Sequence, residues 1–156
     1  MKILVLSDSH GRETATYEIM AEHTDSDVVI HLGDGEDDID LGLRELPAFG
    51  NKRFIRVRGN CDLGSGLPET SFDNLGGYKF YITHGYRQGV KSGVHLILGE
   101  ALKNDRNVVL FGHTHQQFYE ERHGVHLFNP GSVQRYEYGV IIINEKDGTI
   151  KFEHFN

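Results

Sequence analysis

Metal-binding side chains follow several predicted β-strands of the sequence, and most of them stand beside a glycine. Seven residues form this set: Asp8, His10, Asp34, Asn60, His84, His113 and His115. The set offers carboxylates, imidazoles and one amide, and it has no cluster of thiolates. These ligands favour borderline cations such as Mn²⁺, Ni²⁺, Fe²⁺ or Zn²⁺ over a Cys₄ zinc site or an all-oxygen Ca²⁺ site.

The number of candidate ligands indicates two ions rather than one. Two divalent cations roughly 3.5–4 Å apart clamp the attacking and leaving oxygens of a phosphoryl displacement, and they acidify the water between them. A protein with such a centre needs no nucleophile of its own. Each fragment alone has a simpler interpretation, since Asp34 is also a good helix cap and Asn60 a good turn residue. The hydrolase hypothesis therefore rests on the complete set.

The elements predicted for the first sixty residues explain why these side chains should meet. Short apolar runs predict buried strands at 2–7, 27–33 and 53–59, and helical spacing predicts helices at 12–23 and 36–46. The order βαβαβ implies a parallel sheet with right-handed crossovers. Open α/β sheets bind ligands at the carboxyl ends of their strands, which is where the candidate residues stand.

The second half of the chain follows a different pattern. Strands are predicted at 78–85 and 107–115, flanking a helix within 90–103. Two antiparallel hairpins should follow, turning at His123-Gly124 and Asp147-Gly148. Parallel units followed by hairpins indicate mixed sheets with helices on the outside. No linker, repeat or low-complexity tract interrupts the sequence, so we expect a single domain over 1–156.

Composition narrows the classes of function. The chain has 156 residues, a formal net charge of −7 and one cysteine. No apolar run approaches the ~20 residues that span a bilayer, and the first residues do not resemble a signal peptide, so we expect no membrane partner. A single cysteine suits a reducing cytoplasm. The acidic balance disfavours a nucleic-acid polymer as substrate, and thus a nuclease.

The motif series D-x-H, GD, GN, H and GH-T-H, in this order, resembles that of the calcineurin-like metallophosphoesterase superfamily. The short chain, GNCD and the late NPGS (129–132) narrow the resemblance to the small YfcE-type phosphodiesterases. It implies an α/β fold of two mixed β-sheets packed as a sandwich and flanked by helices, in four layers. It also implies a small phosphodiester substrate, hydrolysed by a water or hydroxide that bridges two divalent cations, Mn²⁺ foremost.

The resemblance also assigns roles to residues of this sequence. One ion would be held by Asp8, His10 and His115, and the other by Asn60, His84 and His113, with Asp34 bridging both. Asp62 would support the loop behind the ligands. His31 is not a ligand in this family, so a packed histidine is expected there.

Cys61 is the departure from the wider superfamily, which has histidine after the GN pair. That histidine is thought to protonate the leaving group or to hold the phosphate. A thiol is a weaker hydrogen-bond donor, and a missing general acid costs ~10²–10⁴ in rate. The change would favour diesters with good leaving groups. The alternative of a Cys61 nucleophile in a C-x₅-R motif requires arginine at position 67, which is Leu67.

Three further questions stay open at this point. A retromer subunit of the same fold also lacks that histidine, so a metal-binding interaction scaffold is the alternative to an enzyme.

Arg12, Tyr86 and Arg87 adjoin the motifs, but solvated loop residues are the simpler interpretation, and no substrate-binding residue is assigned. Exposed strands of the C-terminal hairpins offer edges for pairing, so a homo-oligomer is a hypothesis.

Overall fold

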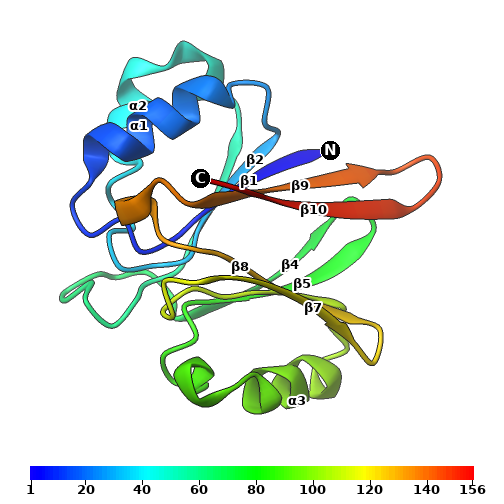
Figure 1. The fold of residues 1–156 in the computed structure, drawn as a ribbon. Coiled ribbons are helices and arrows are strands. Elements are labelled where there is room, and N and C mark those ends of the chain that lie inside the picture. Colours follow the sequence, from blue (N-terminus) through cyan, green and yellow to red (C-terminus); the bar gives the residue numbers. More distant parts are fainter.

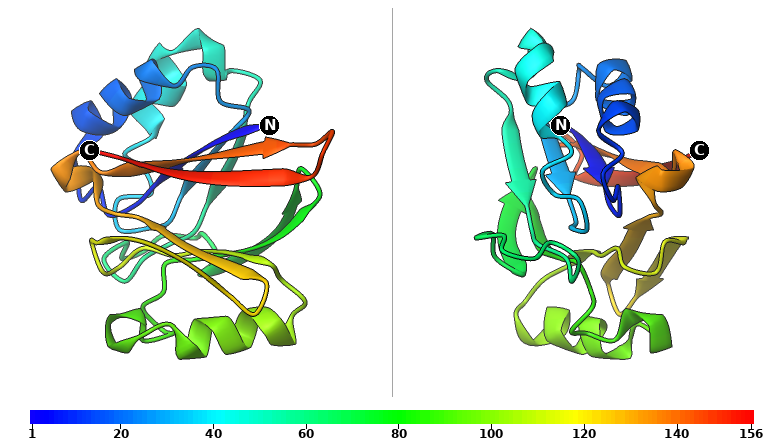
Figure 2. Two further views of the ribbon diagram at one scale, coloured as in Figure 1. Left: turned by 45° about the vertical axis from the view of Figure 1, so that its right-hand side comes forward. Right: turned by 90° about the vertical axis from the view of Figure 1, so that its left-hand side faces the viewer.

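Two mixed five-stranded β-sheets pack face to face in the computed structural model, which describes residues 1–156 (Figure 1). The first sheet has the strand order β10-β9-β1-β2-β3, and the second has the order β4-β5-β6-β8-β7. Helices cover the two outer faces (Figure 2). The predicted fold class, a sandwich of mixed sheets flanked by helices, is confirmed.

The first sheet contains the predicted βαβαβ unit. Its strands are β1 (Lys2–Leu6), β2 (Val28–His31), β3 (Arg53–Arg56), β9 (Tyr138–Asn144) and β10 (Thr149–Phe155). Strands β1, β2 and β3 are parallel, whereas β9 pairs antiparallel with both β1 and β10. The hairpin predicted at Asp147-Gly148 therefore forms the edge of this sheet.

Helices α1 (Glu13–Glu22) and α2 (Asp40–Glu45) lie on the outer face of the first sheet. The second helix is shorter than the predicted 36–46, because the residues before it are bound to neighbouring loops. The Asp38 carboxylate accepts a hydrogen bond from the Gly11 amide at 2.8 Å, and the Gly35 amide donates to Asp62 at 2.6 Å. These bonds hold the segment after β2 as a loop at the sheet edge.

The second sheet carries the later motifs. Its strands are β4 (Thr70–Leu75), β5 (Tyr78–Thr83), β6 (Val108–Leu110), β7 (Gln117–Arg122) and β8 (Val125–Pro130). Strand β4 was not predicted, and the hairpin of β7 and β8 was. The predicted helix at 90–103 is divided into a 3₁₀ turn (Val90–Ser92) and α3 (His95–Lys103). Gly93 separates them with φ of +133°, a conformation that no helix contains.

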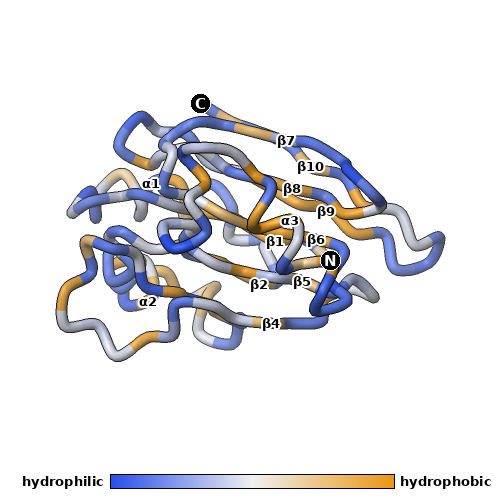
Figure 3. Tube along the Cα trace, turned by 90° about the horizontal axis from the view of Figure 1, so that it is seen from below, coloured by the Kyte–Doolittle hydropathy of each residue, from blue (hydrophilic) through white to orange (hydrophobic).

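The apolar core has three parts, which correspond to the contacts between four layers. The largest lies between the two sheets and includes Ile30, Phe80 and Leu110. A second part packs α1 and α2 on the first sheet, and a third packs α3 on the second sheet. Figure 3 shows the apolar residues concentrated along the inner strands, while polar segments surround them. None of the helices is both long and apolar enough to cross a membrane.

Candidate metal centre

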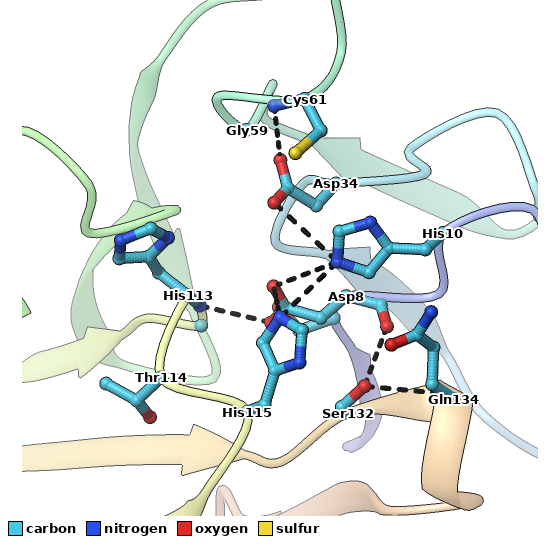
Figure 4. Close-up of polar contacts among 12 residues, drawn as sticks. Asp8, His10, Asp34, Gly59, Cys61, His113, Thr114, His115, Ser132 and Gln134 are labelled. Atoms are coloured by element: carbon cyan, nitrogen blue, oxygen red, sulfur yellow. Dashed lines mark hydrogen bonds and ion pairs between the residues drawn. The ribbon is translucent and has the colours of Figure 1, made fainter. Parts of the chain in front are cut away.

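The predicted ligands lie together where strands of both sheets end. Asp8 and His10 follow β1, Asp34 follows β2, and Asn60 follows β3. The remaining three, His84, His113 and His115, follow β5 and β6 of the second sheet. Figure 4 shows five of these residues converging from both sheets. The expectation that strand ends bring these side chains together is therefore met, and the centre lies at the seam between the two sheets.

Donor atoms within this group form two clusters that are joined by a third. Asp8, His10 and His115 offer ligand atoms within 4.8 Å of one another, as do Asp34, His84 and His113. His10 and Asp34 also lie within that distance of each other and of the Cys61 sulfur. The arrangement suits two cations side by side, each with its own cluster, and the Asp34 carboxylate lies where the two clusters meet.

Five of the seven residues have a left-handed backbone. Their φ angles are between 47° and 65°, and they are Asp8, His10, Asp34, His113 and His115. This region is sparsely populated by residues other than glycine, and each instance costs on the order of 1–3 kcal/mol. Such strain persists only where the surrounding structure dictates it. The surrounding loops therefore hold these side chains in place at the expense of backbone energy.

Two glycines of the motifs make room for the carboxylates. A Cβ added at Gly59 would stand 2.8 Å from the Cγ atom of Asp34, and one at Gly112 would stand 2.7 Å from Asp8 Oδ2. Both distances are too short for non-bonded atoms. Glycine at these positions lets the loop backbone approach each carboxylate, which explains why GN and GH pairs accompany the aspartates.

Asp8 has a buried carboxylate with one oxygen bonded and one oxygen free. Its Oδ2 accepts hydrogen bonds from the Ser7 hydroxyl at 2.6 Å and from the His113 amide at 3.1 Å. Its Oδ1 is buried without a hydrogen-bond partner, and the Nε2 atom of His115 is 3.1 Å away. Leaving a buried carboxylate oxygen unpaired is costly. A cation between Asp8 and the surrounding imidazoles would satisfy it, so the residues present fit a metal.

Electrostatics keep Asp8 ionised. Burial opposes its charge, but the neighbouring His115 imidazole, the charge of His84 and the Ser7 hydroxyl outweigh burial and hold the Asp8 pKa below its usual value. Conversely, the nearby Asp8 carboxylate raises the pKa of His115. An anionic carboxylate facing imidazoles is the state that a divalent cation requires.

Asp34 lies between histidines of the two clusters. Its Oδ1 accepts a hydrogen bond from the Cys61 amide at 2.7 Å. Its Oδ2 is 3.4 Å from His84 Nε2 and 3.8 Å from His10 Nε2. Burial opposes ionisation of Asp34, but the interactions with His84 and the Cys61 amide lower its pKa overall. One oxygen is thus anchored to the backbone and the other points toward both clusters.

His84 is oriented by a backbone carbonyl. Its Nδ1 lies 2.8 Å from the Leu32 oxygen, a contact that requires a proton on Nδ1 and therefore directs Nε2 toward the cluster. That Nε2 atom lies 3.2 Å from the Asn60 Oδ1. Burial would lower the pKa of His84, but Asp34 and Asp8 outweigh it and raise the value. By contrast, burial and the charge of His84 lower the pKa of His113.

Asp62 holds two of the ligand-bearing loops. Its carboxylate accepts hydrogen bonds from the backbone amides of Asp34 (2.8 Å), Gly35 (2.6 Å) and Gly59 (2.7 Å). The loop after β3 is thereby fastened to the loop after β2. The supporting role of Asp62 toward the metal centre stays a prediction.

Cys61 is an exposed, free thiol at the edge of the centre. Partial burial of the sulfur, followed by the nearby carboxylates of Asp34 and Asp62, raises the pKa of the Cys61 thiol. A nucleophilic cysteine needs an electropositive site that lowers this value. The side chains that shift the pKa of Cys61 are therefore carboxylates, and none of them is a cationic group of the kind that activates a nucleophilic thiol.

Other polar residues support the centre, and only the NPGS motif signalled any of them in the sequence. Ser132, in the NPGS motif, donates to the Asp8 carbonyl at 2.8 Å, and Asn129 donates to the Gly112 carbonyl at 2.9 Å. His31 is fully buried among Ser9 and Gly33, as expected for a packed histidine. The motif therefore connects β8 to the loops that carry Asp8 and His113.

A polar cleft adjoins the centre. Four of the residues that line it are Arg58, Glu69, Tyr86 and Arg87. From the sequence, Tyr86 and Arg87 were interpreted as solvated loop residues. Arg12 is exposed at the start of α1 and does not belong to this cleft. Neither Arg58 nor Glu69 follows a motif that would have identified it.

Comparison with known proteins identifies the family. Residues 1–147 match the calcineurin-like phosphoesterase superfamily domain. The chain is 31% identical to "Probable metallophosphoesterase YsnB" of Bacillus subtilis, with 97% of this chain and 90% of that protein covered. It is 28% identical to "Phosphodiesterase YfcE" of Escherichia coli, with 85% of this chain and 79% of that protein covered.

A solved structure supports the fold. Vps29 of Entamoeba histolytica in complex with zinc superposes with a TM-score of 0.75 at 22% identity, with 99% of this chain and 98% of that chain covered. The chain belongs to the calcineurin-like phosphoesterase superfamily. It is thus a metallophosphoesterase, and the predicted enzyme class and its resemblance to the YfcE-type proteins are confirmed.

Proposed function

We propose that this metallophosphoesterase hydrolyses small phosphodiesters at a centre of two divalent cations. The observation that carries the proposal is the buried, unpartnered Oδ1 of Asp8, which faces imidazoles and lies beside a second cluster around Asp34. The names of relatives such as the phosphodiesterase YfcE of Escherichia coli support a diester substrate for this chain too.

In this proposal each cluster holds one ion. The first ion would be bound by Asp8, His10 and His115, and the second by Asn60, His84 and His113, with Asp34 between them. When bound, such a pair supplies an acidified water and neutralises the charge of the transferring phosphoryl group. Mn²⁺ is the expected native ion, and the carboxylate–imidazole ligand set also suits Ni²⁺, Fe²⁺ and Zn²⁺.

The chain itself supplies orientation. The Leu32 carbonyl fixes the tautomer of His84, and the Asp62 carboxylate fixes the loop that carries Asp34. Such supporting partners typically change metal affinity or activity by about 10–100-fold when lost. Asp62 therefore acts by positioning, without contact with the reacting atoms.

The leaving group would receive little help from position 61. Cys61 stands at the edge of the centre, and a neutral thiol is a poor hydrogen-bond donor compared with an imidazolium. Diesters with good leaving groups, which depart without full protonation, are the substrates that tolerate this arrangement.

Substrate size and location follow from charge and composition. With a net charge of −7 and no run of lysines and arginines, the chain is poorly suited to bind long polyanions. We therefore propose small diesters as substrates, one catalytic domain over 1–156 and a location in the cytoplasm, where a free exposed thiol such as Cys61 stays reduced.

A metal screen with matched esters tests the function. Hydrolysis of bis(p-nitrophenyl) phosphate and p-nitrophenyl phosphate is measured with Mn²⁺, Ni²⁺, Mg²⁺ and Zn²⁺. We expect the diester to be cleaved faster than the monoester, with the highest rate in a transition metal. Absence of turnover with every metal would contradict the proposal and favour an interaction scaffold.

The scaffold alternative has one observation in its favour, which is the fold shared with Vps29 of Entamoeba histolytica. That likeness at 22% identity concerns the fold alone. A site that had lost its chemistry would no longer require five ligand-type residues in a left-handed backbone or an unpaired buried carboxylate oxygen. These costly features favour the enzyme.

A further inference from the structure

A cleft opens beside the candidate metal centre, between the loops that follow β3 and β5. Asn60 and His84 line this cleft and also belong to the candidate centre, so the two sites are continuous. Arg58, Glu69 and Arg87 line the same cleft. A group bound there would therefore belong to the same substrate molecule as the phosphoryl group at the metals.

One carboxylate holds the two guanidinium groups of the cleft. Arg58 Nη2 is 2.8 Å from Glu69 Oε1, and Arg87 Nε is 2.8 Å from Glu69 Oε2. Glu69 is the single acidic residue that lines the cleft, so two positive charges face one negative charge. The trio keeps a net positive charge at a site that the substrate can reach.

Both arginines keep unused hydrogen-bond donors. A guanidinium carries five N–H groups, and the contact with Glu69 is the only polar contact of each side chain. The planar arrangement of these groups matches phosphate oxygens better than an ammonium does. Because Glu69 already orders both side chains, less conformational entropy is lost when they bind an anion.

Tyr86 also lines the cleft. The residue is 58% exposed, and its ring lies edge-on to His113 with 5.3 Å between ring centroids. An exposed aromatic ring beside the candidate ligand His113 provides an apolar surface for an organic group that joins two charged ends. The cleft thus offers contacts for the part of the substrate that follows the scissile phosphate.

We infer that Arg58 and Arg87, braced by Glu69, bind a second phosphate group of the substrate, so that the preferred substrates are small phosphodiesters that also carry a phosphate monoester. This inference rests on the proposed function. The metals would act on the diester, and the arginine pair would bind the monoester at the other end of the molecule. Neither arginine contacts the reacting atoms, so both are specificity-determining residues.

Two nitrophenyl esters test the inference directly. The first is thymidine 5′-(p-nitrophenyl phosphate), and the second is the same compound with an added 3′-phosphate. Both release p-nitrophenolate from the same diester, so their ratio of kcat/KM isolates the contribution of the second phosphate. With Mn²⁺ at fixed ionic strength, we expect kcat/KM to be about tenfold higher for the 3′-phosphorylated ester. One hydrogen bond to a charged group is enough to give a preference of this size.

Substitution of the arginines should remove that preference. Arg58→Gln and Arg87→Gln should each lower the ratio several-fold, and the double variant should bring it to about one. Arg44→Gln is the matched control, because Arg44 forms a similar exposed ion pair with Glu45 at 2.8 Å on α2. It changes the net charge equally and should keep the preference. A ratio within one protein does not depend on the fraction that is folded.

Two results would overturn the inference. The first is that the unsubstituted enzyme cleaves the two esters with nearly equal kcat/KM. The second is that the double variant keeps the preference for the 3′-phosphorylated ester. If either occurs while the unphosphorylated ester is cleaved, the proposed function stands and the second phosphate site is wrong. If neither ester nor bis(p-nitrophenyl) phosphate is cleaved with any metal, both the function and the inference are wrong.

Discussion

Asp62 provides the sharpest test of how the loops hold the centre. The Asp62→Asn substitution keeps the size of the side chain and replaces one acceptor oxygen with an NH₂ group. The native carboxylate uses both oxygens, Oδ1 for the Gly35 amide and Oδ2 for the amides of Asp34 and Gly59. The variant must leave at least one amide facing another donor, and the bonds that remain lose their charge.

The size of the effect follows from these contacts. A hydrogen bond to a charged group contributes about 1.5–3 kcal/mol, and an unpaired buried donor costs a similar amount. Since Asp62 is partly exposed, we expect the free energy of unfolding to fall by about 3 kcal/mol, the lower end of the sum of these two terms. Displacement of the Asp34 loop should also lower kcat/KM for bis(p-nitrophenyl) phosphate by about 10–100-fold.

Urea unfolding in the presence of a chelator measures the stability, and nitrophenolate release with Mn²⁺ measures the activity. Asp147→Asn is the control, because Asp147 accepts hydrogen bonds from the amide and hydroxyl of Thr149 in an exposed hairpin turn. Its activity should equal that of the unsubstituted enzyme. The reasoning is refuted if Asp62→Asn unfolds at the same urea concentration and retains full activity.

Two further predictions concern the cysteine and a buried histidine. Cys61→Ser should leave metal-dependent cleavage of nitrophenyl diesters largely intact, and abolished activity at normal metal content would instead revive a thiol mechanism. Cys61→His should raise the rates of esters with poor leaving groups by up to about 10²–10⁴-fold. Unchanged rates of the histidine variant on every ester would show that the position is only structural. Burial lowers the pKa of His31 to about 4 from 6.5, so the unfolded chain binds more protons between these values and stability falls as pH decreases through that window. From pH 7 to pH 5, His31 should lower the free energy of unfolding by about 2 kcal/mol, measured by urea unfolding in the presence of a chelator. The free energy of unfolding of His31→Gln should fall by about that much less over the same pH range. An equal pH dependence of the two proteins would contradict the buried neutral state of His31.

The first two strands of the fold were predictable because they are mostly apolar and buried. Strands β1 and β2 consist almost entirely of buried residues, and their runs in the sequence are unbroken. Strand β4 escaped prediction for the opposite reason. Thr70–Leu75 is an edge strand with a polar sequence, TSFDNL, and only its last residue is buried. Its strand conformation comes from pairing with β5, which no local pattern encodes.

The ligand set was predictable from position, whereas its support was not. Residues at strand ends with neighbouring glycines identified the candidates, because parallel strands end at a common edge. The left-handed backbone of His10 and His115 gives no sequence signal, since histidine rarely adopts it without tertiary constraint. The ion pairs of Glu69 with Arg58 and Arg87 likewise connect loops that are distant in sequence.

The central claim is that a shared carboxylate organises two cations for hydrolysis, and Asp34→Asn tests it most directly. Its Oδ2 lies between His84 and His10, and an amide there would remove the negative charge at the junction of the clusters. The measurement is kcat/KM for bis(p-nitrophenyl) phosphate over a Mn²⁺ titration, before and after chelation. We expect chelation to abolish activity reversibly and Asp34→Asn to lower it by more than about 10²-fold, beyond the loss of a supporting residue. Activity that survives both changes would contradict the account.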